Sequence, residues 1–324
     1  MINIKKIMLM LWGMLGIASW AYSQSASTYP EKPIRIVISF TAGGTTDILA
    51  REVGNQLSIR WKVPVIVENK PGAAGNLGTE IVGRSSPDGY TLLASSIGPI
   101  SINPTLFGKL AVDPQKSLQP IALLGDVPNI LVVPASIGVK NWSEFLAYAK
   151  SHSGSLNYGS TGIGTTAHLI SFLFAQKLGI GATHIPYKGA EATRDLVAGR
   201  LDYMFATAPS VIPLIKAGQL NAIAVSSKKR ISAMPDLPTL KESGVDIATG
   251  AWFGLFAPAG TNPAIVKKLN QMVESILEEP TIKRKLLGLG ADPVQMSDQE
   301  FTNFVRNDHA MWAPIVKASG AKPE

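Results

Sequence analysis

The sequence predicts an α/β protein of two lobes, each built around a largely parallel sheet. Three observations support this prediction: strand and helix patterns alternate in a first round, they alternate again in a second round, and two long apolar runs lie between the rounds. Alternation of strands with helices is typical of a parallel sheet covered by helices. Because such sheets bind ligands at the carboxyl ends of their strands, the loops at those ends are the first places to look for a site.

The first round places strands at residues 34–40, 63–68 and 90–95. Leu49, Val53 and Leu57 give one apolar face to a helix after the first strand, and residues 78–84 suggest a helix after the second. The order strand, helix, strand, helix, strand therefore predicts the core of the first lobe.

The second round alternates helices at 142–151, 167–178, 190–198 and 210–217 with strands at 156–158, 184–187, 202–206 and 220–226. The apolar runs at 121–134 and 250–258 are interpreted as two strands that cross between the lobes. Helices at 262–278, 281–287 and 298–318 would then return to the first lobe. The predicted boundaries are 24–125 plus 252–324 for lobe 1 and 126–251 for lobe 2.

The first 23 residues have the layout of a secretory signal peptide. Lys5 and Lys6 precede an apolar run at 7–17, and small residues follow at Ala21 and Ser23. The alternative, an uncleaved membrane anchor, is disfavoured because the run is too short to span a bilayer comfortably. The chain has no cysteine, which excludes a lipid anchor on a cysteine. We expect a mature protein free in the periplasm.

Composition excludes several classes of function. The formal net charge of +7 favours small anions, whereas scattered basic residues and export argue against nucleic acid. The chain contains no P-loop, G-x-S-x-G or H-E-x-x-H motif, and none of its four histidines is spaced with another as metal ligands. We therefore expect no enzyme activity, cofactor or metal. The alternative is a hydrolase or transferase that uses Ser160 with His168 as its base.

Three loops have the chemistry to hold a carboxylate. Each follows a strand and starts a helix, where glycines allow close approach and free N–H groups with the helix dipole favour an anion. Asp47 is expected to cap the first of these helices, and His168 to support the third loop. The candidate ligand-binding residues are Thr41, Ala42, Gly43, Gly44, Thr45 and Thr46 in the first loop; Gly72, Ala73, Gly75 and Asn76 in the second; and Ser160, Thr161, Thr165 and Thr166 in the third.

Two further features bear on the kind of ligand. The spacing Gly162-x-Gly164-x-x-Ala167 is similar to a dinucleotide fingerprint, but no acidic residue follows about twenty positions later to bind a ribose. The three loops contain no arginine or lysine, although Lys70 and Lys188 lie close in sequence. The sequence thus predicts that neutral donors and helix N-termini bind a small anion.

Several ordered motifs resemble those of the substrate-binding proteins of tripartite tricarboxylate transporters, the Bug family. These are the Gly43-Gly44-x-x-Asp47 loop and the segments 68–75, 86–93, 103–104, 159–168, 184–189, 214–226, 237–239 and 252–255. The resemblance implies a two-lobed periplasmic binding protein of type II, or Venus-flytrap, architecture with two crossover strands. It also implies carboxylate contacts at Ser95 and Ser96, besides the three loops.

The same resemblance implies a monomeric receptor that delivers its ligand to the membrane subunits of such a transporter. Ligands across the family include di- and tricarboxylates, acidic amino acids and aromatic acids. This chain departs from the family pattern at Ala206, where members often carry Asp or Asn after the Phe, so contacts to the ligand there are in question. A periplasmic sensor that binds a ligand but does not serve transport is a further alternative.

Overall fold

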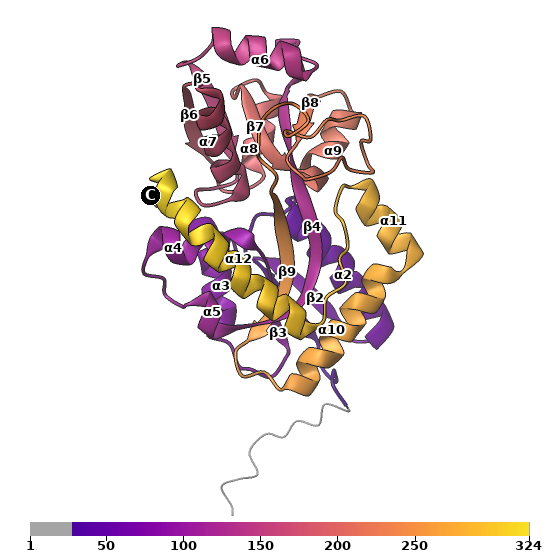
Figure 1. The fold of residues 1–324 in the computed structure, drawn as a ribbon. Coiled ribbons are helices and arrows are strands. Elements are labelled where there is room, and N and C mark those ends of the chain that lie inside the picture. Colours follow the sequence, from indigo (N-terminus) through magenta and orange to yellow (C-terminus); the bar gives the residue numbers. More distant parts are fainter. Residues whose placement is uncertain (1–27, 324) are drawn as a thin grey trace, which may run out of the picture.

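The computed structural model describes residues 28–323 as two α/β lobes joined by two long strands (Figure 1). These strands are β4 (Leu118–Pro134) and β9 (Gly250–Pro258), and they pair antiparallel from Leu118 to Pro128. From Asn129 onward β4 pairs instead with β7 (Tyr203–Thr207) and β8 (Leu220–Val225). The two apolar runs are therefore crossing strands, as predicted from the sequence. The expected signal peptide lies outside the described residues.

Lobe 1 contains β1 (Ile34–Ile38), β2 (Val65–Asn69) and β3 (Thr91–Ser96) in the strand order β2-β1-β3-β9-β4. Strand β1 is parallel to both β2 and β3. Apolar strand residues such as Ile34, Ile36 and Leu92 are fully buried beneath the helices. Its longer helices are α2 (Thr45–Trp61), α3 (Asn76–Gly83), α10 (Pro263–Glu278), α11 (Pro280–Gly288) and α12 (Asp298–Ser319). Short helical turns are η1 (Ala73–Gly75), η2 (Gly98–Ile102), α4 (Asn103–Phe107) and α5 (Pro114–Ser117).

Lobe 2 places β5 parallel to both β6 and β7, while the end of β4 pairs antiparallel with β7 and β8. Its strands are β5 (Leu156–Ser160), β6 (Ala182–Pro186), β7 (Tyr203–Thr207) and β8 (Leu220–Val225). Its helices are η3 (Ala135–Ile137), α6 (Trp142–Ser151), α7 (Thr166–Leu178), α8 (Glu191–Val197) and α9 (Ala208–Lys216). Most predicted elements agree with these bounds to within a few residues, which confirms the two rounds.

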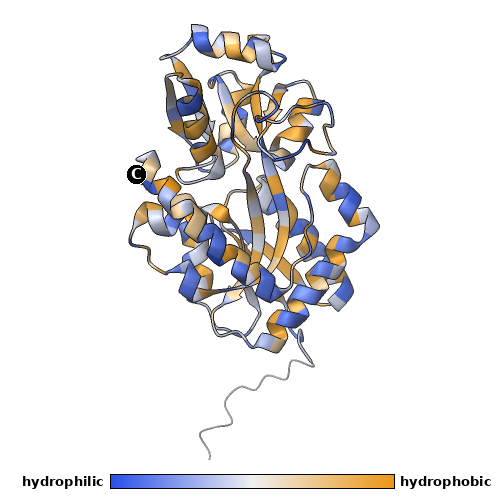
Figure 2. Cartoon of the chain, viewed as in Figure 1, coloured by the Kyte–Doolittle hydropathy of each residue, from blue (hydrophilic) through white to orange (hydrophobic). Residues whose placement is uncertain are grey.

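Strand β4 contributes to two hydrophobic cores. Ile130 and Val132 belong to a large core that extends through lobe 1, whereas Leu131 and Val133 belong to a smaller core in lobe 2. This alternation follows from the two-residue period of a strand, whose successive side chains point to opposite faces. Figure 2 shows the resulting apolar character of the strands and the more polar outer helices. The strand that links the lobes is thus anchored on both of its faces.

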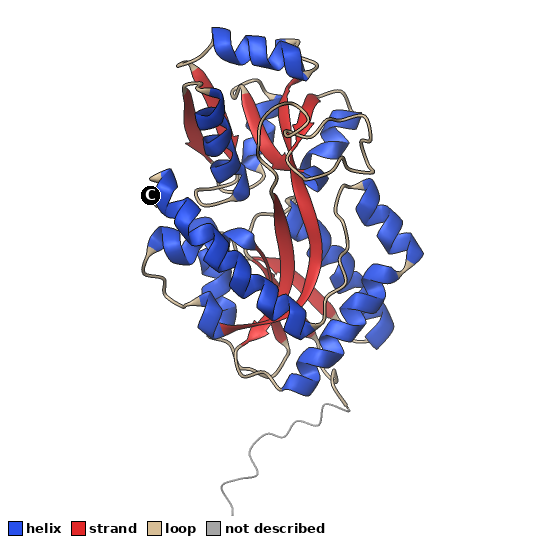
Figure 3. Ribbon diagram, in the orientation of Figure 1, coloured by secondary structure: helices blue, strands red, loops and turns tan. Residues whose placement is uncertain are grey.

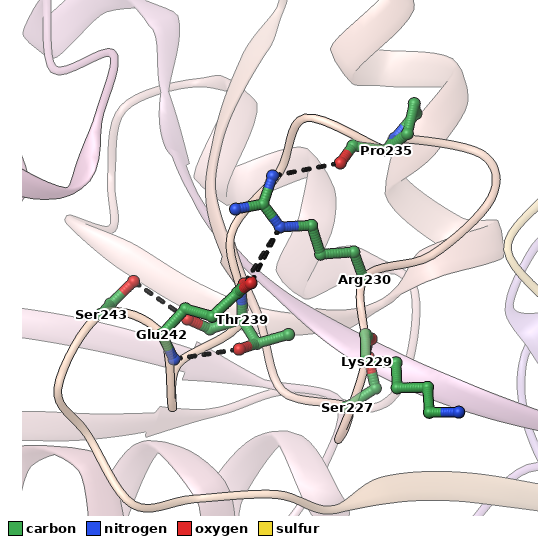
Figure 4. A network of polar contacts seen from close by, with 7 residues as sticks. All are labelled: Ser227, Lys229, Arg230, Pro235, Thr239, Glu242 and Ser243. Carbon is green, nitrogen blue, oxygen red and sulfur yellow. Dashed lines mark hydrogen bonds and ion pairs between the residues drawn. The ribbon is translucent and has the colours of Figure 1, made fainter.

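A long irregular segment, residues 226–249, separates β8 from β9 and is drawn as loop in Figure 3. Arg230 holds it together: its Nε donates to both carboxylate oxygens of Glu242 at 3.1 Å, and its guanidinium donates to the Pro235 carbonyl (Figure 4). Thr239 and Glu242 also bond each other reciprocally, in the pattern of a capping box. The segment is therefore held by specific side-chain bonds. Among residues 28–323, no helix has the length and apolar character that a membrane crossing requires.

Candidate functional site

The two lobes touch across the space between them. The Ala190 N–H of lobe 2 donates to Thr41 Oγ1 of lobe 1 at 3.2 Å, and the hydroxyls of Thr45 and Thr207 lie 2.6 Å apart. These contacts join the start of α2 to the starts of α8 and α9. The described conformation is therefore a closed one, with its cleft covered by both lobes.

A cavity of about 390 Å³ lies in this cleft, and we call it the central cavity. It contains most of the first and third predicted loops. The candidate residues that line it are Thr41, Ala42, Gly43, Gly44, Thr45, Thr46, Ser96, Thr161, Thr165 and Thr166. Helices α2, α7 and α9 all begin at this cavity, so their N-terminal N–H groups and positive dipole ends lie around one space.

The first loop is fixed by Asp47, but not in the predicted way. Gly44, rather than Asp47, is the N-cap residue of α2, so the prediction of an Asp47 cap was wrong. Asp47 lies in the first turn, where its carboxylate accepts the Gly43 N–H at 3.0 Å and also accepts from Arg51 and Asn69. Three donors therefore hold the Asp47 side chain in place. Through its bond to the Gly43 N–H, Asp47 fixes the glycine loop against the first turn of α2.

The third loop is fixed by Thr165 and His168. Thr165 caps α7, where its Oγ1 accepts the His168 N–H, and it donates to the Gly162 carbonyl at 2.7 Å. His168 Nδ1 accepts the Gly164 N–H at 3.2 Å, so this nitrogen carries no proton. His168 thus supports the loop by hydrogen bonding, which is the role that its position in the sequence indicated.

Ser160 lies beneath this loop, and its hydrogen-bond partner is not His168, which the enzyme alternative requires as the base. Its side chain is fully buried, and its Oγ is 2.7 Å from Nε2 of His184, not of His168. The His184 ring stacks on the His168 ring with their centroids 4.0 Å apart. Burial lowers the pKa of His168 to about 4, and burial together with the His168 charge lowers the pKa of His184 to about 3. The pair is therefore neutral at ordinary pH.

Three predicted residues line neither the central cavity nor the cavity beside it. Ser95 is buried and accepts a hydrogen bond from Ser39, while Ser160 is enclosed as described above. Asn76 accepts from the Asn103 side chain at 2.7 Å. Their polar atoms therefore bond other protein groups and hold the loops in shape.

The second loop lines a different cavity. Gly72, Ala73 and Gly75 belong to a neighbouring space of about 580 Å³, which we call the second-loop cavity, together with Tyr187, Lys188 and Glu191. Only glycine suits position 75, because its φ of 89° is positive and a β-carbon there would lie 2.4 Å from Pro99. All three loops contribute to the second-loop cavity, through Thr41, residues 72–75 and Thr161, whereas only the first and third loops line the central cavity.

Several residues that line the central cavity were not predicted, and one of them carries a charge. Arg194 of α8 lines the central cavity, and it is the one charged side chain among the described residues that do so. Its guanidinium makes no ion pair or hydrogen bond within residues 28–323. Other residues that line the cavity are apolar, including Ile48, Pro213 and Phe253. The strand–loop–helix pattern of β6 and α8 is the signal that would have pointed to this region.

A third cavity, of about 490 Å³, lies beside the crossing strands, and we call it the hinge cavity. It is lined by Asp126 and Pro128 of β4, by residues 227–232 with the basic side chains Lys228, Lys229 and Arg230, and by Asp292 with its neighbours after α11. Charges of both signs therefore face one another there. Within residues 28–323, no cluster of three histidine, cysteine or acidic side chains is placed to hold a metal ion.

Comparison with known proteins gives consistent results. Residues 49–321 match the model of the tripartite tricarboxylate transporter family receptor. A Cupriavidus necator protein, described as the UPF0065 protein in the gbd 5′ region, is 38% identical over 90% of this chain and 88% of its own length.

Two solved structures from Rhodopseudomonas palustris are also similar. Rpa4515, solved with adipate, has a TM-score of 0.88 and 33% identity, and covers 91% of this chain and 100% of its own. MatC, solved with malate, has a TM-score of 0.83 and 32% identity over 89% of this chain and 100% of its own. The chain therefore belongs to the tripartite tricarboxylate transporter receptor family, whose members are solute-binding receptors and not enzymes.

Proposed function

We propose that this chain is an exported periplasmic receptor that binds a small carboxylate in the central cavity. It would deliver this ligand to the membrane subunits of a tripartite tricarboxylate-type transporter. The observation that carries the proposal is electrostatic: among the described residues that line the cavity, the single charge is the cation of Arg194. No lining carboxylate neutralises it, so an anion brings the charge that the cavity lacks.

Neutral donors add to this cation. The hydroxyls of Thr46, Ser96, Thr161 and Thr166 line the cavity and have no hydrogen-bond partner within residues 28–323. The N-terminal ends of α2, α7 and α9 supply further N–H groups and favour negative charge. The anion is therefore held by neutral donors together with the Arg194 guanidinium, and not by neutral donors alone as the sequence predicts.

The energies are sufficient for useful affinity. A hydrogen bond to a charged group contributes about 1.5–3 kcal/mol, and a helix terminus adds about 0.3–1 kcal/mol. A micromolar Kd corresponds to about 8 kcal/mol. A few such contacts reach that value after the cost of association, and burial of the ligand's carbon atoms against Ile48, Pro213 and Phe253 contributes further.

Matched ligand pairs test the proposal. Calorimetry on the mature protein should show micromolar binding of at least one small carboxylate, such as malate or adipate, because the cavity's positive charge selects the anion. The corresponding amide, of nearly equal shape, should bind at least about 100-fold more weakly, since it carries no charge. Equal binding of acid and amide would contradict a site built for anions.

Native mass spectrometry of freshly purified protein identifies the ligand directly, through the mass of any co-purified acid. The same measurement tests export, because a mature chain without residues 1–23 supports the periplasmic assignment. A retained Met1 together with membrane association would contradict it.

A further inference from the structure

The central cavity and the second-loop cavity are neighbours separated by a thin partition. Among the described residues, three line both spaces: Phe40, Thr41 and Thr161. Phe40 and Thr41 follow β1 in lobe 1, whereas Thr161 comes from the third loop, in lobe 2. The partition is therefore completed only when the lobes close.

Thr41 is the tightest part of this partition. Its Oγ1 accepts the Ala190 N–H at 3.2 Å, and a β-carbon built on Gly189 would lie only 2.2 Å from the same oxygen. Gly189 has a φ of 112°, which favours glycine, so the chain of lobe 2 comes as close to Thr41 as a backbone can. No carbon chain of a ligand can pass between Thr41 and Gly189 in this conformation.

The two spaces also differ in chemistry. The central cavity holds the unpaired guanidinium of Arg194 and no carboxylate, whereas the second-loop cavity holds Lys188 and Glu191 together. The far end of a long ligand would reach the Lys188 ammonium only if the partition were open. A short ligand is satisfied within the central cavity alone.

We propose that Thr41 sets the upper limit on ligand length in this receptor, because it closes the central cavity against the second-loop cavity. The inference rests on the proposed function, since it concerns the carboxylate bound in the central cavity. The second-loop cavity is then a latent extension of the site, suited to the distal carboxylate of a longer diacid.

A homologous series of straight-chain diacids, from malonate to sebacate, tests this inference. Calorimetry on wild-type protein gives the Kd for each length, and the same series is then measured on Thr41→Ala. Removal of the hydroxyl and methyl groups joins the two spaces, so the ratio of long-chain to short-chain affinity should rise by at least about tenfold. Thr41→Ser, which keeps the acceptor for Ala190, should give a smaller shift in the same direction.

Two controls separate length from general loss of binding. Thr41→Val keeps the bulk of the partition but removes the acceptor for the Ala190 N–H, so it should weaken all lengths without changing their order. Thr46→Ala alters a residue that lines the central cavity but not the second-loop cavity, and it should behave in the same way. Thermal unfolding of each variant checks that the fold is retained.

The outcomes are distinct. A length profile that Thr41→Ala leaves unchanged, on a wild-type protein that binds diacids, overturns the length limit and leaves the proposed function standing. A shift that Thr41→Val reproduces also overturns it, because the hydrogen bond rather than the partition would then be responsible. If wild-type protein binds no carboxylate of any length, the proposed function fails and this inference fails with it.

Discussion

The central cavity and the hinge cavity both lie between the lobes and have similar volumes, about 390 and 490 Å³. Their linings differ in kind. The hinge cavity brings Asp126 and Asp292 together with Lys228, Lys229 and Arg230, and the Arg230 guanidinium is already paired with Glu242. The central cavity has one cation without a counter-charge and the N-terminal ends of three helices.

Cavity size alone therefore does not predict which space binds an anion. An anion gains most where positive potential is uncompensated, since opposite charges that already face each other leave little for a ligand to neutralise. We therefore expect the larger hinge cavity to bind an anion more weakly than the central cavity. If the central cavity alone binds the ligand, changes to its lining should alter affinity and changes to the hinge cavity should not.

The largest expected effect comes from Gly189, which closes the central cavity against Thr41. Gly189→Ala places a methyl group 2.2 Å from Thr41 Oγ1 in the closed conformation, so the lobes cannot close fully around a ligand. We expect ligand affinity to fall at least about 100-fold by calorimetry.

Gly218→Ala is the matched control for this change. Gly218 also has a positive φ, of 70°, but a β-carbon there meets nothing within 4 Å, so the variant has the backbone strain without the clash. Its affinity should stay near that of wild type. The double variant Gly189→Ala with Thr41→Ala should recover part of the loss, and equal losses in Gly189→Ala and Gly218→Ala would show that backbone strain, not lobe contact, is the cause.

The next effect is the pH dependence of the unfolding free energy, which the pair His168 and His184 beneath the third loop should cause. The described lining of the hinge cavity contains no histidine, so that cavity should not contribute to it. An unfolded histidine has a pKa near 6.5, whereas burial lowers the pKa of His168 to about 4 and of His184 to about 3. The unfolded chain therefore binds more protons below pH 6.5. The stabilisation from the neutral pair is fully present above about pH 6.5 and is lost as the pH falls toward 4.

Chemical unfolding at pH 7 and pH 5 measures this loss. Wild-type protein should lose about 2 kcal/mol of unfolding free energy over that range through each of the two histidines. His184→Phe keeps a ring against His168 but cannot bind a proton, so it should lose about half as much. Replacement of His152, which is exposed at the end of α6, should leave the wild-type loss unchanged. If His184→Phe loses as much as wild type, the pair does not cause the acid sensitivity.

Much of the fold could be predicted from the sequence because its signals are local. The crossing strands were found because β4 and β9 are mostly apolar, and the first and third loops because each lies between a strand and a helix. The irregular segment 226–249 could not be predicted, since its shape depends on bonds of Arg230 with Glu242 and Pro235 and not on a period.

The site was predicted less completely, for reasons of distance along the chain. The partition between the cavities depends on a bond between Thr41 and Ala190, which are 149 positions apart. The partner of Ser160 is His184 on the neighbouring strand β6, whereas the sequence offered the nearer His168. Arg194 lies within a helix, where an isolated cation in the sequence is typical of a solvent-facing position.

The smallest of the three effects decides most directly between the two cavities. Arg194 and Lys229 are both exposed cations that line a space between the lobes, and neither makes a side-chain ion pair within residues 28–323. Arg194→Gln removes the uncompensated charge of the central cavity while keeping polar length, so carboxylate affinity should fall about tenfold. Lys229→Gln removes one charge from a cavity that already contains both signs, and calorimetry should show less than about a twofold change. Because both variants lower the net charge equally, a general long-range attraction would affect them equally and would weaken with added salt. A larger loss of carboxylate affinity in Lys229→Gln than in Arg194→Gln would instead assign the anion to the hinge cavity.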